Sequence, residues 1–181
     1  MVAYHITLHA LKRGDDGVDL VGDINAVIIA QSIRTDPEWR NGDYTEQPHG
    51  LTSMLPLMQM MLEGVPQLQT MIANTGQAET FVQKIVTAAP SRDANDIMYS
   101  LESSADYNPH HLERIKAKLF ALNFEDDEIN PVELNILPPA IKRVKNGSFY
   151  NVPTSLNTHG HSSIARPELW SAKVAEFLAT L

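Results

Sequence analysis

Two strand-like segments and two helical segments alternate in the C-terminal third of the chain. Residues 119–122 form an apolar run of strand length, and residues 148–152 are predicted to form a second strand, which Pro153 ends. Helical patterns are expected over residues 131–145 and 167–178. This order of strand, helix, strand, loop and helix predicts a parallel sheet with covering helices.

Residue spacing also predicts which faces of two helices are apolar. Asp23 is expected to cap a helix over residues 24–33, with Ile24, Val27 and Ile28 on its apolar face. The last helix is expected to bury one stripe of residues four apart: Trp170, Val174 and Leu178.

Residues 50–89 are rich in methionine and leucine. Pro66, Gly76 and Pro90 divide this stretch into three short helices that are apolar almost all round, so something must cover them. Methionine suits irregular and adaptable surfaces. The stretch is therefore interpreted as a lid over an apolar cavity, as a dimer seam or as ordinary core.

These patterns divide the chain into three parts. Residues 1–22 stay unassigned, although residues 4–11 alternate like a strand, and their His5 and His9 fit solvated histidines better than a metal site. Residues 23–111 are expected to form a helical lid or cap. Residues 112–181 are expected to form the α/β core.

Composition excludes several classes of protein. Fourteen basic and twenty-two acidic residues give a net charge of −8, which disfavours nucleic acid as a partner. With no cysteine, disulfides, thiol catalysis and cysteine-based zinc sites are excluded. No apolar stretch reaches about 18 residues and no signal-peptide pattern occurs, so we expect a cytoplasmic protein without a membrane span.

Candidate chemistry lies in two places. A cluster of carboxylates at 125–128 follows the first strand-like run, where an open parallel sheet gathers its functional groups. A glycine-hinged loop about thirty residues later carries His159 and His161. An acid followed by a histidine is the order of the last two members of a Ser-Asp-His triad. No G-x-S-x-G elbow occurs in the 181 residues, and neither Ser53 nor Ser162 lies on a strand-to-helix elbow.

Several segments carry a family resemblance. Residues 33–48 with the following Gly50-Leu51 pair, residues 126–131, and Gly160-His161 resemble the homoserine O-acetyltransferase-like α/β hydrolases. The resemblance covers about residues 23–181 and corresponds to the C-terminal half of such a protein, without the half that carries the nucleophile elbow. It implies the C-terminal part of an α/β-hydrolase fold, with parallel strands, covering helices and a helical lid insertion.

The resemblance also implies roles for individual residues. The family's triad acid falls on Asp127, with Asp126 and Glu125 as rivals, and the triad histidine follows a glycine, which selects His161 over His159. In such a triad the histidine takes a proton from the hydroxyl nucleophile, and the aspartate orients the ring.

Substrate features of the family are altered in this chain. Ser162 replaces the aspartate that follows the triad histidine in homoserine acetyltransferases, and residues 52–55 lack their arginine. Homoserine is therefore disfavoured, and a neutral or apolar acyl substrate is expected. Tyr44, in a polar loop, is expected either to anchor the loop or to line a pocket. We list Tyr44 and Ser162 as substrate-binding candidates.

Two functional hypotheses follow. In the first, the chain is a portion of a serine-dependent O-acetyltransferase or ester hydrolase that contributes Asp127 and His161, the serine lying on a missing or separate segment. Its partners would be a small-molecule ester or acyl-CoA, the N-terminal half of the enzyme and other copies in a homo-oligomer such as a dimer. No cofactor is expected, since acyl-CoA would be an acyl-donor substrate. In the second, it is a non-catalytic binding or oligomeric protein derived from an α/β hydrolase.

Overall fold

The computed structural model describes residues 20–103 and 111–181. Within these ranges the chain divides into two compact units. The first comprises residues 62–67 and 111–181, and the second comprises residues 20–61 and 68–103. The strand predicted over residues 4–11, with His5 and His9, lies outside the described residues.

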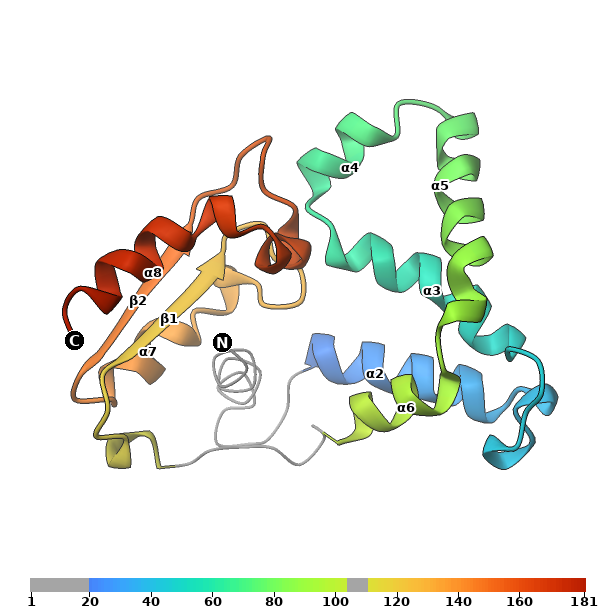
Figure 1. Cartoon of the computed structure of the whole chain (residues 1–181), viewed down its shortest axis with the longest axis horizontal. Helices are drawn as coiled ribbons and strands as arrows, with labels where there is room; N and C mark the ends of the chain where they lie inside the picture. The colour runs from blue at the N-terminus through green and yellow to red at the C-terminus, as the bar shows by residue number, and fades with distance from the viewer. Residues whose placement is uncertain (1–19, 104–110) are drawn as a thin grey trace. The chain divides into compact units, whose positions relative to one another are not determined.

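The first unit contains a parallel sheet. Strand β1 (Leu119–Phe124) pairs with strand β2 (Gly147–Val152), with Leu119 opposite Gly147 and Phe124 opposite Val152. Helix α7 (Leu137–Lys142) lies between them in sequence (Figure 1). A parallel pair needs such a crossover connection. The predicted order of strand, helix and strand is therefore confirmed.

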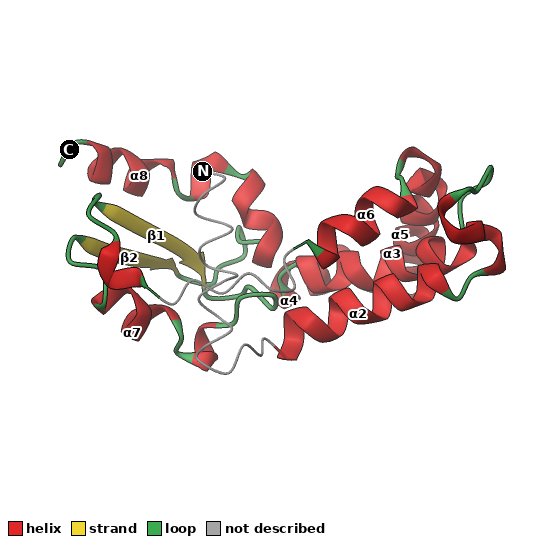
Figure 2. Cartoon of the chain, turned by 90° about the horizontal axis from the view of Figure 1, so that it is seen from below, coloured by secondary structure: helices red, strands yellow, loops and turns green. Residues whose placement is uncertain are grey.

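Strand β1 is buried on both faces of this sheet. The side chain of Ala121 packs against α7, whereas the next residue, Leu122, packs with Phe124 on the opposite face. Helix α7 and the last helix, α8 (Ser171–Leu178), cover opposite faces of the sheet in both views (Figures 1 and 2). Burying each large apolar side chain stabilises the fold by about 1.5–3 kcal/mol. This burial explains why residues 119–122 read as a continuous apolar run.

The helix predicted over residues 131–145 is interrupted. A 3-10 turn (Val132–Leu134) ends at Asn135, which has a left-handed backbone with φ of 50°. Helix α7 then runs for only six residues. Asparagine tolerates the left-handed region better than most residues, so it can end a helical segment without a glycine.

The buried face of α8 also differs from the prediction. Leu178 is exposed, while Phe177 stacks on Phe120 with 5.3 Å between the ring centroids. Residues 167–169 form a 3-10 turn before α8, so the helix starts later than its apolar spacing indicated. Position 177, three residues after Val174, therefore faces the sheet in place of position 178.

The second unit is helical. Its elements come from five helices, and the segment 62–67, which belongs to the first unit, includes the end of the second of them and the start of the third. The helices are α2 (Leu20–Arg34), α3 (His49–Leu62), α4 (Val65–Met71), α5 (Thr75–Ala88) and α6 (Ala94–Glu102). Residues 50–89 thus form three helices, as predicted. Helix α2 begins before Asp23, so the expected N-cap at Asp23 is wrong.

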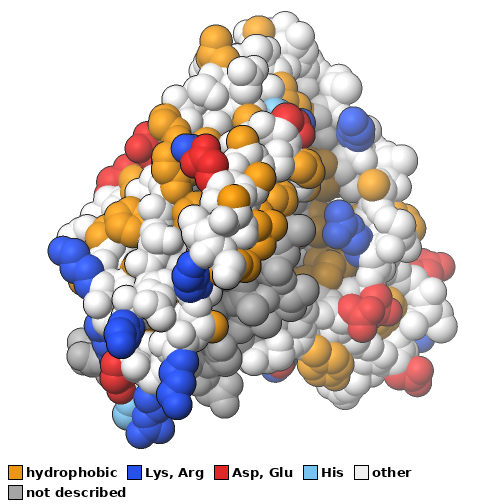
Figure 3. Space-filling view, turned by 60° about the vertical axis from the view of Figure 1, so that its left-hand side comes forward, with side chains coloured by type: hydrophobic (Ala, Val, Ile, Leu, Met, Phe, Trp, Pro, Cys, Tyr) orange, Lys and Arg blue, Asp and Glu red, His pale blue; other side chains and the backbone are white. Residues whose placement is uncertain are grey.

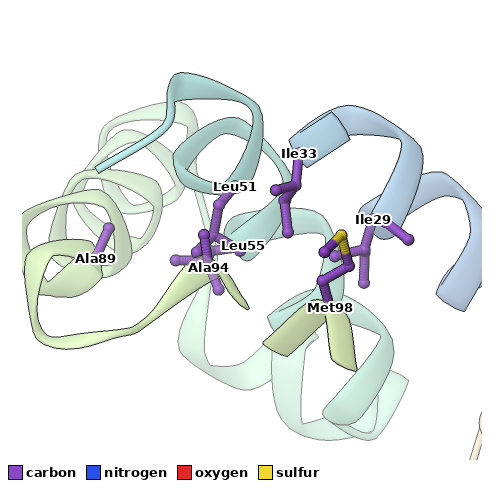
Figure 4. Packing of buried hydrophobic residues seen from close by; sticks show 8 residues of the cluster. Ile29, Ile33, Leu51, Leu55, Ala89, Ala94 and Met98 are labelled. Atoms are coloured by element: carbon purple, nitrogen blue, oxygen red, sulfur yellow. The ribbon is translucent and has the colours of Figure 1, made fainter. Parts of the chain in front are cut away.

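The core of the second unit gathers side chains from α2, α3 and α6, together with Ala89 directly after α5. Figure 4 shows its main members: Ile29, Ile33, Leu51, Leu55, Ala89, Ala94 and Met98. The predicted apolar face of α2 was wrong, because Val27 is 64% exposed and Ile28 is 42% exposed. Each residue turns a helix by about 100°. A face centred on positions 29, 30 and 33 therefore leaves position 27 outside.

Helices α2 and α3 come into close contact at Gly50. A Cβ atom there would overlap the backbone carbonyl of Ser32. The Asp36 carboxylate accepts the backbone N–H of Gly50 at 2.6 Å and that of Glu38 at 2.9 Å. These two hydrogen bonds, the one from Gly50 first, lower the pKa of Asp36 below its ordinary value. The start of α3 is thereby tied to the end of α2.

Hydrophobic side chains also remain on the surface, scattered among charged ones (Figure 3). In and beside α3 and α4, exposed large apolar residues are Leu57, Met60, Val65 and Met71. Over the ranges that the structure describes, no helix is long and apolar enough to cross a membrane.

Candidate active site

Asp127 lies in a tight turn directly after β1. Its backbone N–H donates to the carbonyl of Phe124, the last residue of the strand, at 3.3 Å. Its carboxylate Oδ1 accepts the backbone N–H groups of Ile129 at 2.8 Å and Asn130 at 2.9 Å. This is an Asx-type turn, in which an aspartate caps the backbone that follows it. The strand and the turn together fix the position of Asp127, which is only 2% exposed.

Two asparagines support this turn. The side chain of Asn130 donates to Asp127 Oδ2 at 3.0 Å, and the side chain of Asn123 in β1 donates to the carbonyl of Asn130 at 2.8 Å. Both asparagines are buried. The sequence analysis did not assign Asn130, although an asparagine three residues after the candidate acid is a signal for such a turn.

His161 reaches Asp127 from the loop after β2. Gly160, with a left-handed φ of 54°, turns the chain, and His161 Nδ1 lies 2.9 Å from Asp127 Oδ2. A carboxylate only accepts, so Nδ1 carries the proton of this hydrogen bond. The Asn130 amide nitrogen, 3.2 Å from Nδ1, is itself a donor directed to the carboxylate. In the neutral ring, Nε2 is then the atom able to accept a proton.

The surroundings keep the Asp127 carboxylate charged. Burial raises the pKa of Asp127, but the hydrogen bond and charge of His161, with the hydrogen bonds from Asn130, outweigh it. The net result is a pKa below the ordinary value. An ionised aspartate beside Nδ1–H stabilises the imidazolium that forms when Nε2 takes up a proton.

The other candidate acids and the second histidine have different partners. Asp126 Oδ2 accepts the backbone N–H of Gly160 at 3.1 Å, and Glu125 Oε2 accepts that of Thr154 at 3.3 Å. His159 Nδ1 lies 3.1 Å from Glu63 Oε2. The structure thus brings Asp127 and His161 together, and gives their neighbours roles in holding the loops.

The remaining candidates lie in different surroundings. Ser162 is half-buried directly after His161, in the 3-10 segment Gly160–Ala165. Tyr44 belongs to the second unit, where its hydroxyl accepts the Ala94 N–H at 2.8 Å. Burial raises the pKa of the Tyr44 phenol. Tyr44 packs against the core of the second unit, as expected of an anchor. Ser53 is an exposed residue of α3.

Comparison with known proteins relates this geometry to a fold. No protein-family model matches the sequence, and no curated protein matches it. Solved structures do match, among them the homoserine O-acetyltransferase from Bacillus anthracis, with 22% identity, a TM-score of 0.74, and coverage of 88% of this chain and 49% of that chain. Esterase E22 matches with 17% identity, a TM-score of 0.71 and coverages of 88% and 51%. The acetyl esterase MekB matches with 19% identity, a TM-score of 0.66 and coverages of 87% and 50%.

These likenesses establish the fold. The chain is helix-rich with parallel strands and has the fold of the C-terminal portion of an α/β hydrolase, which confirms the predicted fold class and the structural side of the resemblance. The chain spans about half the length of the solved structures that it matches. Among the residues that the structure describes, no group of three or more acidic or histidine side chains could hold a metal ion.

Proposed function

We propose that this chain contributes the acid, Asp127, and the base, His161, of a Ser-His-Asp triad to a serine-dependent acyl-transfer enzyme. The hydrogen bond of 2.9 Å between His161 Nδ1 and the buried Asp127 carboxylate is the main support. The matched structures are named as an acetyltransferase and esterases, which supports the same class of reaction. The serine would come from a separate segment, because these 181 residues contain no G-x-S-x-G elbow.

The geometry is suited to moving one proton in each half of the reaction. As a serine hydroxyl attacks the acyl carbonyl, His161 Nε2 takes the hydroxyl proton, and Asp127 stabilises the resulting imidazolium. The proton then passes to the leaving group, and an acyl-enzyme remains. In the second half, water or an acceptor hydroxyl gives its proton to Nε2 and attacks the acyl group. The acyl–serine bond then breaks, and Nε2 passes its proton to the serine oxygen. The free enzyme and either an acid or a new ester result.

The substrate would carry a neutral or apolar acyl group. Ser162 follows the base without adding a charge, and residues 52–55 are uncharged. A substrate with an ammonium and a carboxylate group, such as homoserine, would find no charged partner at these positions. We propose Ser162 as a substrate contact, and Tyr44 stays a predicted one. Either an ester or acyl-CoA would serve as acyl donor.

Hydrolysis of p-nitrophenyl acetate tests the proposal. The full chain is produced together with the polypeptide encoded immediately upstream, provided that this polypeptide carries a G-x-S-x-G elbow. We expect ester hydrolysis by the mixture. His161→Ala should reduce kcat by about six orders of magnitude, because triad members act as a unit. Asp127→Asn should reduce it by about four orders.

Two exposed residues provide matched controls, His111→Ala and Asp43→Asn, which should leave the rate unchanged. An active mixture that is indifferent to both triad substitutions would show that the assignment is wrong. If no upstream elbow exists, the missing nucleophile favours the alternative, a non-catalytic binding or oligomeric protein. Light scattering at several concentrations then separates a monomeric binder from an obligate oligomer.

A further inference from the structure

A second group of ionisable side chains lies beside the triad candidates, within the first unit. Glu63 Oε2 is 3.1 Å from His159 Nδ1, and an Arg166 guanidinium nitrogen lies 3.2 Å from the same Nδ1 atom. The side chains of Glu63 and His159 are each only 12% exposed. Glu63 belongs to the segment between α3 and α4, so it is 96 residues away from His159 in the sequence.

Hydrogen-bond chemistry defines what this group does. Arginine only donates and a carboxylate only accepts, so Nδ1 of His159 can bond to one of them at a time. With the proton on Nδ1, His159 donates to the Glu63 carboxylate across the 3.1 Å contact. Glu63 then anchors the side chain of His159, two residues before His161.

The backbones of the two segments are also in contact. A Cβ atom on Gly160 would lie 2.8 Å from the nitrogen of Gly64 and 2.9 Å from the carbonyl carbon of Glu63. A Cβ atom on Gly64 would lie 2.9 Å from the nitrogen of Gly160 and would overlap the Asp126 carboxylate. That carboxylate accepts the Gly160 N–H at 3.1 Å. Gly160 is therefore in close contact with both Gly64 and the turn after β1.

We propose that Glu63 and Gly64 are positioning residues for His161. Glu63 holds His159 and Gly64 contacts Gly160, so the two residues directly before His161 are both held by the segment 62–67. The direction of the imidazole is then set by the connection between α3 and α4 as well as by Asp127. The inference relies on the proposed function only in naming His161 as the base.

The side-chain proton of His161 offers a direct test in the resting full chain. Nuclear magnetic resonance of the histidine-labelled protein resolves the Nδ1–H that bonds to Asp127, and its loss in His161→Ala assigns it. In Glu63→Ala, which removes a hydrogen bond to a charged group, we expect this proton to exchange with water about tenfold faster or more. In Gly64→Ala, where the added Cβ would press against the backbone of Gly160, we expect a change in the same direction. The backbone N–H of Asn130, which bonds to Asp127 Oδ1, should keep its protection.

Matched variants control for the substitutions themselves. Glu168→Ala removes an exposed carboxylate of the same unit, and Gly76→Ala adds a Cβ where the only close atom is at an ordinary 3.5 Å. Both should leave the His161 proton unchanged. Should Glu63→Ala fail to fold, Glu63→Met, which keeps the length of the side chain and removes the carboxylate acceptor, takes its place.

An unchanged His161 proton in both test variants would overturn the inference. Equal loss of protection at Asn130 would also overturn it, since that would show general loosening instead of a displaced loop. The exchange measurement needs no catalytic turnover, so its outcome does not depend on whether the proposed function is correct. Faster exchange together with a catalytically inert complex would refute only the function. Unchanged exchange together with an active, His161-dependent complex would refute only the positioning role.

Discussion

At the scale of single residues, the Asp127 carboxylate accepts hydrogen bonds from both backbone and side chains. Ile129 and Asn130 donate their backbone N–H groups to one oxygen, while Asn130 and His161 donate side-chain groups to the other. A buried anion needs this number of donors, because each lone pair left without one costs free energy. The conformation of this turn therefore depends on the hydrogen bonds to the Asp127 carboxylate as well as on the backbone.

Asp127 should make the stability of the chain depend on pH. Its folded-state pKa is lowered, so its contribution is present above the unfolded pKa and is lost as pH falls through the folded pKa. Asp127→Asn, which cannot ionise, should destabilise the chain by about 1–3 kcal/mol at neutral pH. That difference should shrink below about pH 4. Urea unfolding of both proteins at several pH values measures it, and a constant difference would contradict the assignment.

Asn130 should contribute to the state of Asp127. Asn130→Ala removes the amide that donates to Oδ2, which should lower the free energy of unfolding by about 1–2 kcal/mol. It should also raise the pKa of Asp127, because one hydrogen bond that favours the ionised form is lost. Carbon NMR titration of the carboxyl group measures this pKa. Asn157→Ala, an exposed position in the loop after β2, is the control and should change neither quantity.

At the scale of elements, the approach of α2 to α3 depends on the absence of a side chain at position 50. Gly50→Ala should lower the free energy of unfolding by about 1–3 kcal/mol, because the new methyl group would overlap the carbonyl of Ser32 and force the helices apart. Thermal and urea unfolding measure the loss. Gly76→Ala in α5 should change stability by less than about 1 kcal/mol. Equal effects of the two substitutions would show that the close approach is unimportant.

The elements themselves were largely predictable because their periods are local. The apolar run at residues 119–122 and the period of the segments around it predicted the parallel pair and its crossover helix. The buried face of α2 was not predictable in the same way. Ile24, Val27 and Ile28 form a valid apolar stripe, but so do Ile29, Ala30 and Ile33, and only packing against α3 and α6 selects between them. The helix predicted over residues 131–145 is interrupted at Asn135. The left-handed backbone of this residue depends on its surroundings, so the local sequence did not predict it.

In the candidate site, too, local features were predictable from the sequence and long-range contacts were not. Asp127 and His161 could be selected from motif order and resemblance, and the structure places them in contact. The role of Asn130 could have been predicted, since its hydrogen bond to Asp127 spans only three residues. Glu63 was not, because nothing near residue 63 indicates that it meets a histidine 96 positions later. Such long-range pairs depend on the fold of the first unit.

At the scale of the whole molecule, the described part of the sheet has two strands. A two-stranded sheet is marginal alone, and the chain covers about half of each matched structure. Both facts agree with the proposal that a further segment would complete the sheet and the triad.

A fluorophosphonate probe, which labels an activated serine, should separate the chain from its complex. The chain alone should not be labelled, because it has no elbow serine. With a segment that carries the elbow, labelling should appear on that segment and should disappear in His161→Ala. Mass spectrometry locates the label. A label on Ser53 or Ser162 of the isolated chain would contradict the proposed division of the triad.

The turn around Asp127 has a consequence for such an assembly. Its donors all belong to this chain, so the acid is oriented before any second segment arrives. Most of the conformational entropy at that end of the site is then lost when this chain folds, not when the parts meet. Association should accordingly behave as docking of preorganised surfaces, at about 10⁵–10⁷ M⁻¹s⁻¹. Its strength would depend on how well the added strands fit the sheet.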